Sequence, residues 1–169
     1  MNIITLSFAC GDGLGAAAAA MVGQNLGRGR ADISLLYGKV AQRIAWGFSA
    51  ALFVLFCTCG RIFMGWFSDS PTVISEGILI LYVVAFVSLA QVSQVIFTGS
   101  LRGAGDTRYN AVVSFFSIDL IRPAFAYLLC HVLQIGVIGA WFALAFDQYL
   151  RFILVTVHFY RGKWMKIKL

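Results

Sequence analysis

The sequence predicts an all-α polytopic membrane protein, a bundle of five transmembrane helices. Hydrophobic residues make up 60% of the chain and charged residues 12%, whereas soluble domains average about 45–50% and about 25%. Ten of the 13 Lys and Arg residues form three clumps, separated by strongly apolar intervals of 58 and 52 residues. One transmembrane helix needs about 20 apolar residues, so each interval holds two passes and returns to its starting side. The clumps are Arg28, Arg30, Lys39 and Arg43; Arg102 and Arg108; and Arg161, Lys163, Lys166 and Lys168.

The distribution of basic residues predicts the orientation of the chain. Cytoplasmic loops of membrane proteins carry an excess of Lys and Arg, and the predicted outer connections contain only Arg61. We therefore expect all three clumps and the C-terminus on the cytoplasmic side of a plasma (bacterial inner) membrane. Amphipathic aromatic rings also fall at the predicted interfaces, namely Trp66, Tyr109, Tyr160 and Trp164.

The predicted spans form one transmembrane domain that covers residues 1–169. Pro71 suits the first turn of the third span, and Pro123 interrupts the fourth. Five spans with no cytoplasmic segment before them suggest the later part of a longer protein. The spans lie at about 3–23, 40–60, 73–99, 109–135 and 137–159, and a basic cytoplasmic tail follows at 160–169.

Composition and spacing argue against several other classes of protein. A net charge of +6 could indicate nucleic-acid binding, but that requires a basic face with interleaved aromatics, and here the basic residues lie at span ends. The four cysteines form no CxxC pair and have no histidine at metal-ligand spacing. No Ser, Cys or Asp accompanies either histidine as a catalytic set. We therefore expect no nucleic-acid partner, no metal, no cofactor and no enzyme activity.

Glycine spacing in the first span allows two interpretations. Gly11 to Ala16 reads G-x-G-x-x-A, as in a dinucleotide-binding turn, with Asp32 at a suitable distance. That fold would also need amphipathic helices and further parallel strands, and the rest of the chain offers unbroken apolar runs. Small residues four apart instead let membrane helices approach closely. We favour helix packing through Gly11 and Gly15, Gly23 and Gly27, and Gly99 and Gly103.

The segment from Leu101 to Arg108 predicts a tight cytoplasmic turn. Its glycines, Gly103 and Gly105, end the third span and allow a reversal with positive φ. Asp106 is placed to cap the next helix by accepting its free backbone N–H groups. Arg102 and Arg108 anchor the turn at the membrane surface. These residues predict a well-built turn without chemistry of its own.

Two pairs of opposite charges lie within the predicted spans. Asp119 and Arg122 are three residues apart and Asp147 and Arg151 four apart, so each pair shares a helix face. A charge at mid-bilayer costs about 3 kcal/mol, so Asp119 and Arg122 together cost about 6 kcal/mol. Burying the thirteen Leu, Ile, Phe and Val side chains of the fourth span in lipid contributes roughly 4–8 kcal/mol in return. That helix is marginal alone and must turn its charges toward protein or a watery cavity. The pairs either line a solute path or lock helices together.

Further polar features lie in the third and fourth spans. Gln91 and Gln94 polarise the inner half of the third span, where they either line a cavity or bond to other helices. Pro123 follows Arg122 and should kink the fourth span, a feature tolerated where a cavity or a neighbouring helix helps.

Five short motifs in register resemble the multidrug and toxic compound extrusion (MATE) transporters. Two of the motifs lie at the ends of spans. The first contains Gly23, Gln24 and Gly27, and the second contains Arg102, Gly103, Gly105, Asp106 and Thr107. The motifs are Ala20–Gly27, Leu101–Thr107, Arg122-Pro123, Gly136–Trp141 and Gly162–Trp164.

The resemblance implies twelve helices in two lobes that exchange protons or sodium for organic cations by alternating access. The five spans would then be helices 8–12, within the C-terminal lobe, and the partners would be the missing N-terminal lobe, membrane lipid and the exported cations. In one branch of the family the coupling carboxylate lies in the N-terminal lobe. In another, acids of the seventh and tenth helices bind sodium, and the span matching the tenth contains only Glu76. The resemblance therefore implies that the H⁺- or Na⁺-binding residues lie outside this chain.

Two other functions remain compatible with the residues. A related flippase for lipid-linked sugars should carry more basic residues inside its spans than Arg122 and Arg151, because it must bind a pyrophosphate. A non-transporting membrane scaffold would use the Gly-x-x-x-Gly faces to bind partner helices. On the transporter hypothesis, the candidate cavity-lining residues are Gln91, Gln94, Asp119, Arg122, Asp147 and Arg151.

Overall fold

A computed structural model describes residues 2–65, 71–132, 134 and 137–166, and these residues form helices and turns without a strand. Trp66, Gly136 and the side chains of Arg61 and Glu76 lie outside the description. In chain order the α-helices are α1 (Asn2–Gly27), α2 (Ala31–Gly65), α3 (Pro71–Gly103), α4 (Thr107–Ser114), α5 (Arg122–Tyr127) and α6 (Val137–Arg161). The π-helix η1 (Phe115–Ile121) joins α4 to α5, and the π-helix η2 (Leu128–Val132) continues α5, so that the four form one long rod. The short 3₁₀-helix η3 (Lys163–Lys166) is the last described element.

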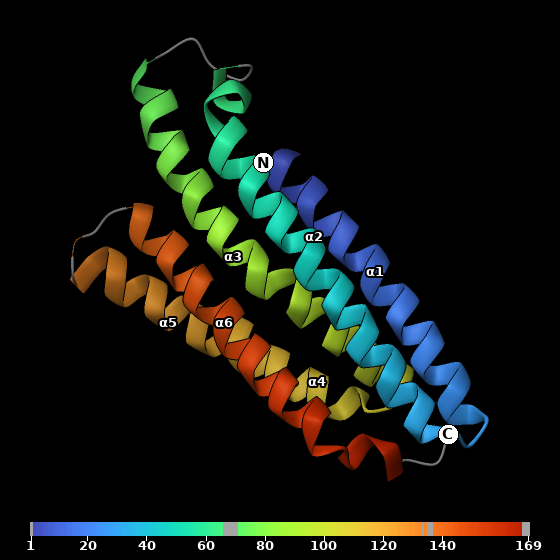
Figure 1. The fold of residues 1–169 in the computed structure, drawn as a ribbon. Coiled ribbons are helices and arrows are strands. Elements are labelled where there is room, and N and C mark those ends of the chain that lie inside the picture. The colour runs from blue at the N-terminus through green and yellow to red at the C-terminus, as the bar shows by residue number, and fades with distance from the viewer. Residues whose placement is uncertain (1, 66–70, 133, 135–136, 167–169) are drawn as a thin grey trace.

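α3 is the central element of the bundle. It packs against α1 and α2 on one side and against α6 on the other, and the rod that contains α4 and α5 packs on α6 (Figure 1). Among the described residues, four helical stretches are long and apolar enough to cross a membrane: Ala31–Gly60, Ile80–Gly103, Thr107–Val132 and Ile138–Arg161. α1 is not among these four, and the side chains of its first seven residues are not described. The all-α membrane bundle expected from composition is confirmed.

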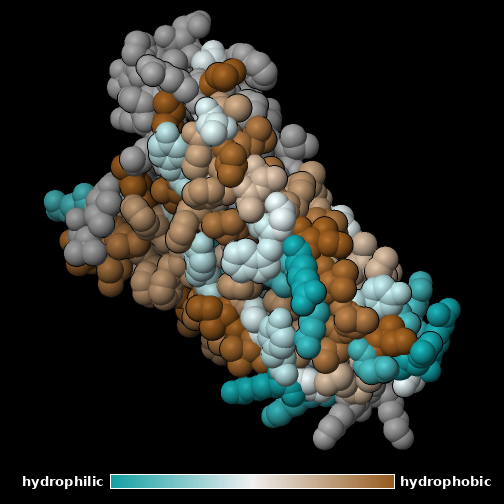
Figure 2. Space-filling view, in the orientation of Figure 1, coloured by the Kyte–Doolittle hydropathy of each residue, from teal (hydrophilic) through white to brown (hydrophobic). Residues whose placement is uncertain are grey.

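The described residues of the three basic clumps lie toward the same end of the bundle. α1, α3 and α6 end there, and the hydrophilic surface gathers mostly at this end in Figure 2. One buried cluster explains why these helix ends meet. It combines Val22 and Leu26 of α1, Phe97 and Leu101 of α3, Ala104, Val113 of α4, Val155 and Phe159 of α6, and Trp164 of η3.

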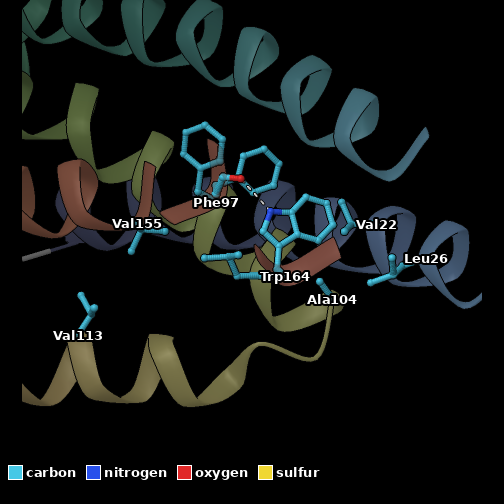
Figure 3. Close-up of a cluster of buried hydrophobic side chains, with 9 residues drawn as sticks. Val22, Leu26, Phe97, Ala104, Val113, Val155 and Trp164 are labelled. Carbon is cyan, nitrogen blue, oxygen red and sulfur yellow. Dashed lines mark hydrogen bonds between the residues drawn. The ribbon is translucent and has the colours of Figure 1, made fainter. Parts of the chain in front are cut away.

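Trp164 is the centre of this cluster and corrects an expectation. The sequence places it at a membrane interface, but its side chain is fully buried in protein. Gly162 turns the chain back with φ +68°, which favours glycine, and the indole then stacks on Phe159 with ring centroids 5.1 Å apart. The indole Nε1 donates a hydrogen bond to the Phe159 carbonyl at 2.9 Å (Figure 3). The first residues of the basic tail are therefore part of the packed basic end of the bundle.

Glycines on α1 and α3 let these two helices touch backbone to backbone. A Cβ added at Gly99 would strike the backbone of Gly15, and one added at Gly103 would strike the backbone of Ala19. Gly23 faces the carbonyl of Gly103. The predicted close packing thus holds for most of these glycines but not for Gly27, where an added Cβ would meet nothing within 4 Å. Gln24, from the same motif, is exposed.

The turn between α3 and α4 forms where the glycines predict it. Gly105 has φ +81°, a conformation that glycine adopts at little cost. Asp106 occupies the N-cap position of α4, but its side chain makes no capping hydrogen bond, so the capping prediction is wrong. Instead its Oδ2 lies 2.7 Å from Nε2 of His158 on α6. A carboxylate that joins a distant histidine cannot also cap its own helix.

His158, which the sequence places near a span end without catalytic partners, contacts two residues of the α3–α4 region. Its ring stacks on Tyr109 with centroids 3.6 Å apart and planes 7° apart. The Tyr109 hydroxyl in turn donates to the backbone carbonyl of Leu154 at 3.1 Å. These contacts hold the α3–α4 turn and the start of α4 against the C-terminal end of α6.

Removing the Asp106–His158 interaction should lower the free energy of unfolding by a moderate amount. The Asp106–His158 pair is largely buried, with side-chain exposures of 14% and 15%, and a hydrogen bond to a charged group contributes about 1.5–3 kcal/mol. We expect His158→Leu to lower the free energy of unfolding by about 2 kcal/mol, because it leaves the carboxylate of Asp106 unpaired. Unfolding in mixed detergent–SDS micelles, followed by circular dichroism, measures the change.

The double variant Asp106→Asn, His158→Leu provides the control for that prediction. It should be more stable than His158→Leu alone, because a neutral amide costs less to leave unpaired than a carboxylate. Equal stabilities of the single and double variants would contradict a role for the pair.

The rod that contains α4 and α5 departs from regular α-helical geometry around Pro123. The backbone N–H of Arg122 bonds to the carbonyl of Ser117, five residues back, which is the π-helical pattern. Pro123 lacks an N–H and removes one bond from the ladder, and the adjoining π-turns absorb this disruption. The expected irregularity at Pro123 therefore takes the form of π-helix on both sides of α5.

Candidate functional site

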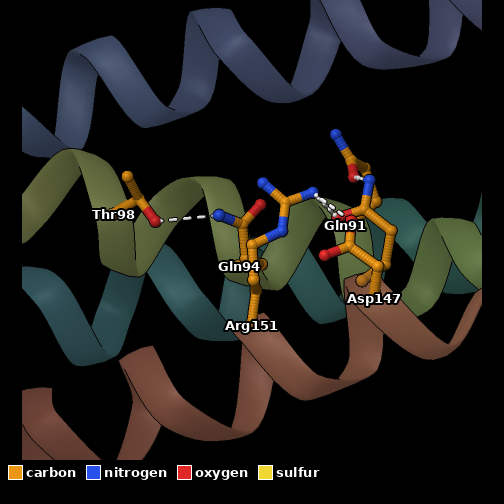
Figure 4. A network of polar contacts seen from close by, with 6 residues as sticks. Gln91, Gln94, Thr98, Asp147 and Arg151 are labelled. Atoms are coloured by element: carbon orange, nitrogen blue, oxygen red, sulfur yellow. Dashed lines mark hydrogen bonds and ion pairs between the residues drawn. The ribbon is translucent and has the colours of Figure 1, made fainter. Parts of the chain in front are cut away.

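A network of polar side chains joins the middle of α3 to the middle of α6. Arg151 Nη2 lies 3.1 Å from Asp147 Oδ2 and donates a second hydrogen bond to Gln148 Oε1 at 2.6 Å. Gln148 Nε2 then donates to Gln91 Oε1 across the helix interface. On α3, Gln94 Nε2 donates to the Thr98 hydroxyl at 3.0 Å (Figure 4).

The network is buried within two helical stretches that are long and apolar enough to cross a membrane. Asp147 is 0% exposed and Arg151 9% exposed. Both belong to the span Ile138–Arg161, and the glutamines belong to the span Ile80–Gly103. Ionisable residues inside membrane spans are expensive and generally mark functional sites or pair with one another. Here the i, i+4 spacing allows Asp147 and Arg151 to pair, as the sequence predicts.

Several atoms of this region have no partner among the described residues. They are buried atoms of Asp147 (Oδ1), Arg151 (Nε) and Ser93 (Oγ). Buried polar groups normally have a hydrogen-bond partner, so these atoms keep donor and acceptor capacity that the described residues do not use.

The other predicted charge pair does not form. The described residues make ion pairs between Asp147 and Arg151 and between Asp106 and His158, and neither includes Asp119 or Arg122. Asp119 lies in η1 and is exposed, and Arg122 begins α5 and is half-buried. A π-helix has more residues per turn than an α-helix, so residues three apart no longer lie one above the other. The expected shared face of Asp119 and Arg122 is therefore lost.

Gln148 is the member of the network that sequence reasoning missed. It is 5% exposed and links Arg151 to Gln91, 57 residues earlier in the chain. Its place directly after an intramembrane acid was the only signal available. Asn110 was missed in the same way, and its Nδ2 donates to the Thr98 carbonyl at 3.1 Å.

The described side chains do not form a cluster of metal ligands. In the described part of the chain, no three His, Cys, Asp or Glu residues gather in a way that could hold one. None of the four cysteines forms a disulfide bond within the described part of the chain.

Comparison with known proteins identifies the family. The sequence model of the MatE family matches residues 1–128. This chain belongs to the MatE (MATE) family. The probable multidrug resistance protein NorM of Thermotoga maritima is 24% identical over 98% of the chain, and a protein with the same description from Shewanella oneidensis is 32% identical over 83% of it. The crystal structure of the eukaryotic MATE transporter AtDTX14 superposes on 96% of the chain with a TM-score of 0.90 at 19% identity, which shows a shared fold.

The chain spans about a third of the length of these relatives. It covers 36% of the Thermotoga protein, 32% of the Shewanella protein and 36% of AtDTX14. The fold is therefore part of a MATE transporter lobe in a multi-pass membrane protein. The resemblance deduced from the five motifs is confirmed at the level of the family.

Proposed function

We propose that this chain forms helices 8–12 of a two-lobed antiporter that exports organic cations by alternating access. It would rock against an N-terminal lobe and expose a central cavity first to one side of the membrane and then to the other. Membership of the MATE family supports the transporter class. The names of the NorM relatives support multidrug compounds as the substrate class.

The polar network around Asp147 is the observation that carries this proposal. A buried carboxylate in the middle of a membrane span costs several kcal/mol and persists where it serves packing or transport. Its unpaired Oδ1 offers an acceptor to a cationic group, and Gln91 adds a polar side chain on the facing helix. Aromatic side chains on the same two helices, such as Tyr149 and Phe86 with ring centroids 5.1 Å apart, suit the apolar parts of an organic cation.

Coupling and orientation complete the proposal. The coupling ion, H⁺ or Na⁺, would bind mainly through residues outside this chain. The basic end that carries Arg28, Arg102 and Arg161 would face the cytoplasm of a bacterial inner membrane, following the positive-inside rule. Membrane lipid and the N-terminal lobe would cover the apolar sides of the helices.

Transport of ethidium by the full-length protein in everted vesicles tests the role of Asp147. We expect Asp147→Asn to reduce the initial rate of uptake by about tenfold or more, because losing one charge-assisted interaction of 1.5–3 kcal/mol has an effect of that size. Collapsing the pH gradient or the sodium gradient separately should identify the coupling ion, because only one of the two treatments should stop uptake.

Asp32→Asn is the matched control, because Asp32 is an exposed acid in the first turn of α2 and lies far from the network in the sequence. It should transport at the wild-type rate. If Asp147→Asn folds normally and also transports at that rate, the network is structural and the proposed cavity role of Asp147 is wrong.

A further inference from the structure

Side chains of α2, α3 and α6 meet around the ring of Phe159 on α6. Phe97 of α3 packs on this ring with centroids 4.8 Å apart and on the ring of Tyr160 with centroids 5.9 Å apart. From α2, a Cβ added at Gly38 would strike the Phe159 ring, and Lys39 Nζ lies 5.9 Å from the centroid of the Tyr160 ring. These contacts place one turn of each helix at a common level, and we call the five residues the three-helix junction.

Buried polar atoms without a partner gather beside this junction. Among the described residues, eight buried side-chain N and O atoms lack a hydrogen-bond partner, and four of them belong to Gln42, Ser100 and Thr156. Gln42 follows Gly38 by four residues on α2, so the two share a helix face. In the same way Ser100 lies three residues after Phe97 on α3, and Thr156 lies three residues before Phe159 on α6.

The directions of the helices bring these three side chains together. α2 begins at the basic end, whereas α3 and α6 end there (Figure 1). Side chains of a helix lean toward its N-terminus. Gln42 therefore leans back toward the junction, and Ser100 leans toward it from the opposite direction. The ring of Phe159 leans over the preceding turn of α6, which contains Thr156, so all three side chains reach the level of the rings.

We propose that Gln42, Ser100 and Thr156 form an internal water site between α2, α3 and α6. The amide of Gln42 offers both N–H donors and a carbonyl acceptor, and each hydroxyl can donate and accept. Water also donates and accepts, and a buried water molecule typically makes about three hydrogen bonds to buried polar groups. Three helices each supply one such group here. The site does not depend on the proposed transport, because bound water can be detected without a substrate or a gradient.

The same residues argue against an ion as the ligand. Burying a charge is costly unless it is paired, and neither an amide nor a hydroxyl carries a charge. The ammonium of Lys39 beside the junction would repel a cation. An anion would leave the acceptor Oε1 of Gln42 without a partner. The unpaired atoms are also enclosed by protein, which favours the smallest neutral ligand.

X-ray radiolysis of the purified protein in detergent and ¹⁸O-labelled water tests the proposal. The X-rays convert bound water into hydroxyl radicals, which add oxygen to the nearest aromatic ring. Phe97 and Phe159 are 1% and 0% exposed, so we expect the label on them to come from enclosed water. Phe56 is the matched control, because it is 2% exposed and lies in a cluster with Leu81, Val84 and Ala85. Phe97 and Phe159 should be labelled severalfold more than Phe56, and equal labelling of the three rings would overturn the proposal.

Apolar variants of the site locate the water. Gln42→Leu and Thr156→Val should each reduce the labelling of Phe159. Each should also lower the melting temperature by about 2–4 °C, as expected for the loss of one hydrogen bond in a chain of this size. In a dry site these polar groups would stay unpaired, and apolar replacements would raise the melting temperature instead. A rise in both variants therefore refutes the water site.

Thr58→Val is the control for these variants. Thr58 is an exposed residue of α2 whose hydroxyl bonds to the carbonyl of Val54 in its own helix. This variant should leave the labelling of Phe159 unchanged. The labelling of the wild-type protein tests the site even where a variant does not fold.

Salts distinguish bound water from a bound ion. The melting temperature should be the same in sodium chloride and in choline gluconate at equal ionic strength, because neutral water needs neither sodium nor chloride. A melting temperature that rises and saturates with sodium chloride in the wild type, but not in Gln42→Leu, would show an ion in the site and contradict the proposal.

Discussion

Replacing Gly99 with alanine should lower the free energy of unfolding by about 2 kcal/mol, within the range for overpacking a tight contact. The added Cβ would strike the backbone of Gly15, and a backbone cannot rotate away as a side chain can. α1 and α3 would have to separate along their whole contact, which loses the close packing that holds membrane helices together. Thermal unfolding in detergent, followed by circular dichroism, measures the loss.

Gly47→Ala is the matched control. Gly47 also lies within a long helix, α2, but a Cβ there meets nothing within 4 Å. Alanine is the better helix former by about 1 kcal/mol, so this variant should be as stable as the wild type or slightly more stable. If Gly47→Ala and Gly99→Ala have the same effect, the loss comes from helix propensity and the contact between α1 and α3 is not close.

A double variant tests whether the two glycine contacts act as one surface. Gly103 lies one turn after Gly99 and meets the backbone of Ala19 on the same partner helix. Once Gly99→Ala has pushed the helices apart, a second Cβ at position 103 should meet less resistance. We expect the double variant to lose less stability than the sum of the two single losses, since mutations in one shared contact are not additive.

The sequence could predict the membrane bundle because its signals are local. Apolar runs of sufficient length and clumps of basic residues each reveal a span or a loop without reference to the rest of the chain. The turn at Gly105 was predictable for the same reason, because glycine is the residue that reverses the chain with positive φ there. Asp147 and Arg151 are four apart on one helix, so their pairing was also readable from spacing.

The remaining contacts could not be predicted because they join residues that are distant in the chain. Asp106 had two possible uses, to cap α4 or to bind another element, and only the fold brings His158 to it from 52 positions away. The link between Gln148 and Gln91 has the same character. The separation of Asp119 from Arg122 depends on a local change to π-helix, which helical spacing rules do not include. The burial of Trp164 requires three helix ends to meet.

Removing either partner of the Asp147–Arg151 pair should be strongly destabilising. Breaking a buried ion pair from one side costs about 3–5 kcal/mol, because it leaves an uncompensated charge in the interior. Arg151→Met should cost more than Asp147→Leu. The carboxylate left behind in Arg151→Met is fully buried and has no other described partner, whereas the guanidinium left behind in Asp147→Leu keeps its bond to Gln148 at 2.6 Å.

The double variant Asp147→Leu, Arg151→Met should recover most of the lost stability. Apolar side chains of similar volume often replace a buried ion pair without loss, because the cost of burying the two charges disappears together with their attraction. Unfolding in mixed detergent–SDS micelles would show this recovery as a coupling free energy of several kcal/mol between the two positions. If the losses of the two single variants simply add, the side chains do not form a pair in the membrane.

The double variant also separates the two roles that the sequence left open for this pair. If the pair only locks α6 in place, the stable double variant should still transport ethidium at close to the wild-type rate. If the pair lines the solute path, the double variant should be stable but inactive, because a stable fold without the carboxylate of Asp147 offers no acceptor to a cation. Stability and transport measured on one folded protein thus assign the pair to structure or to function. Asp147→Leu or Arg151→Met alone does not allow this distinction, because each lowers stability and removes a charge together.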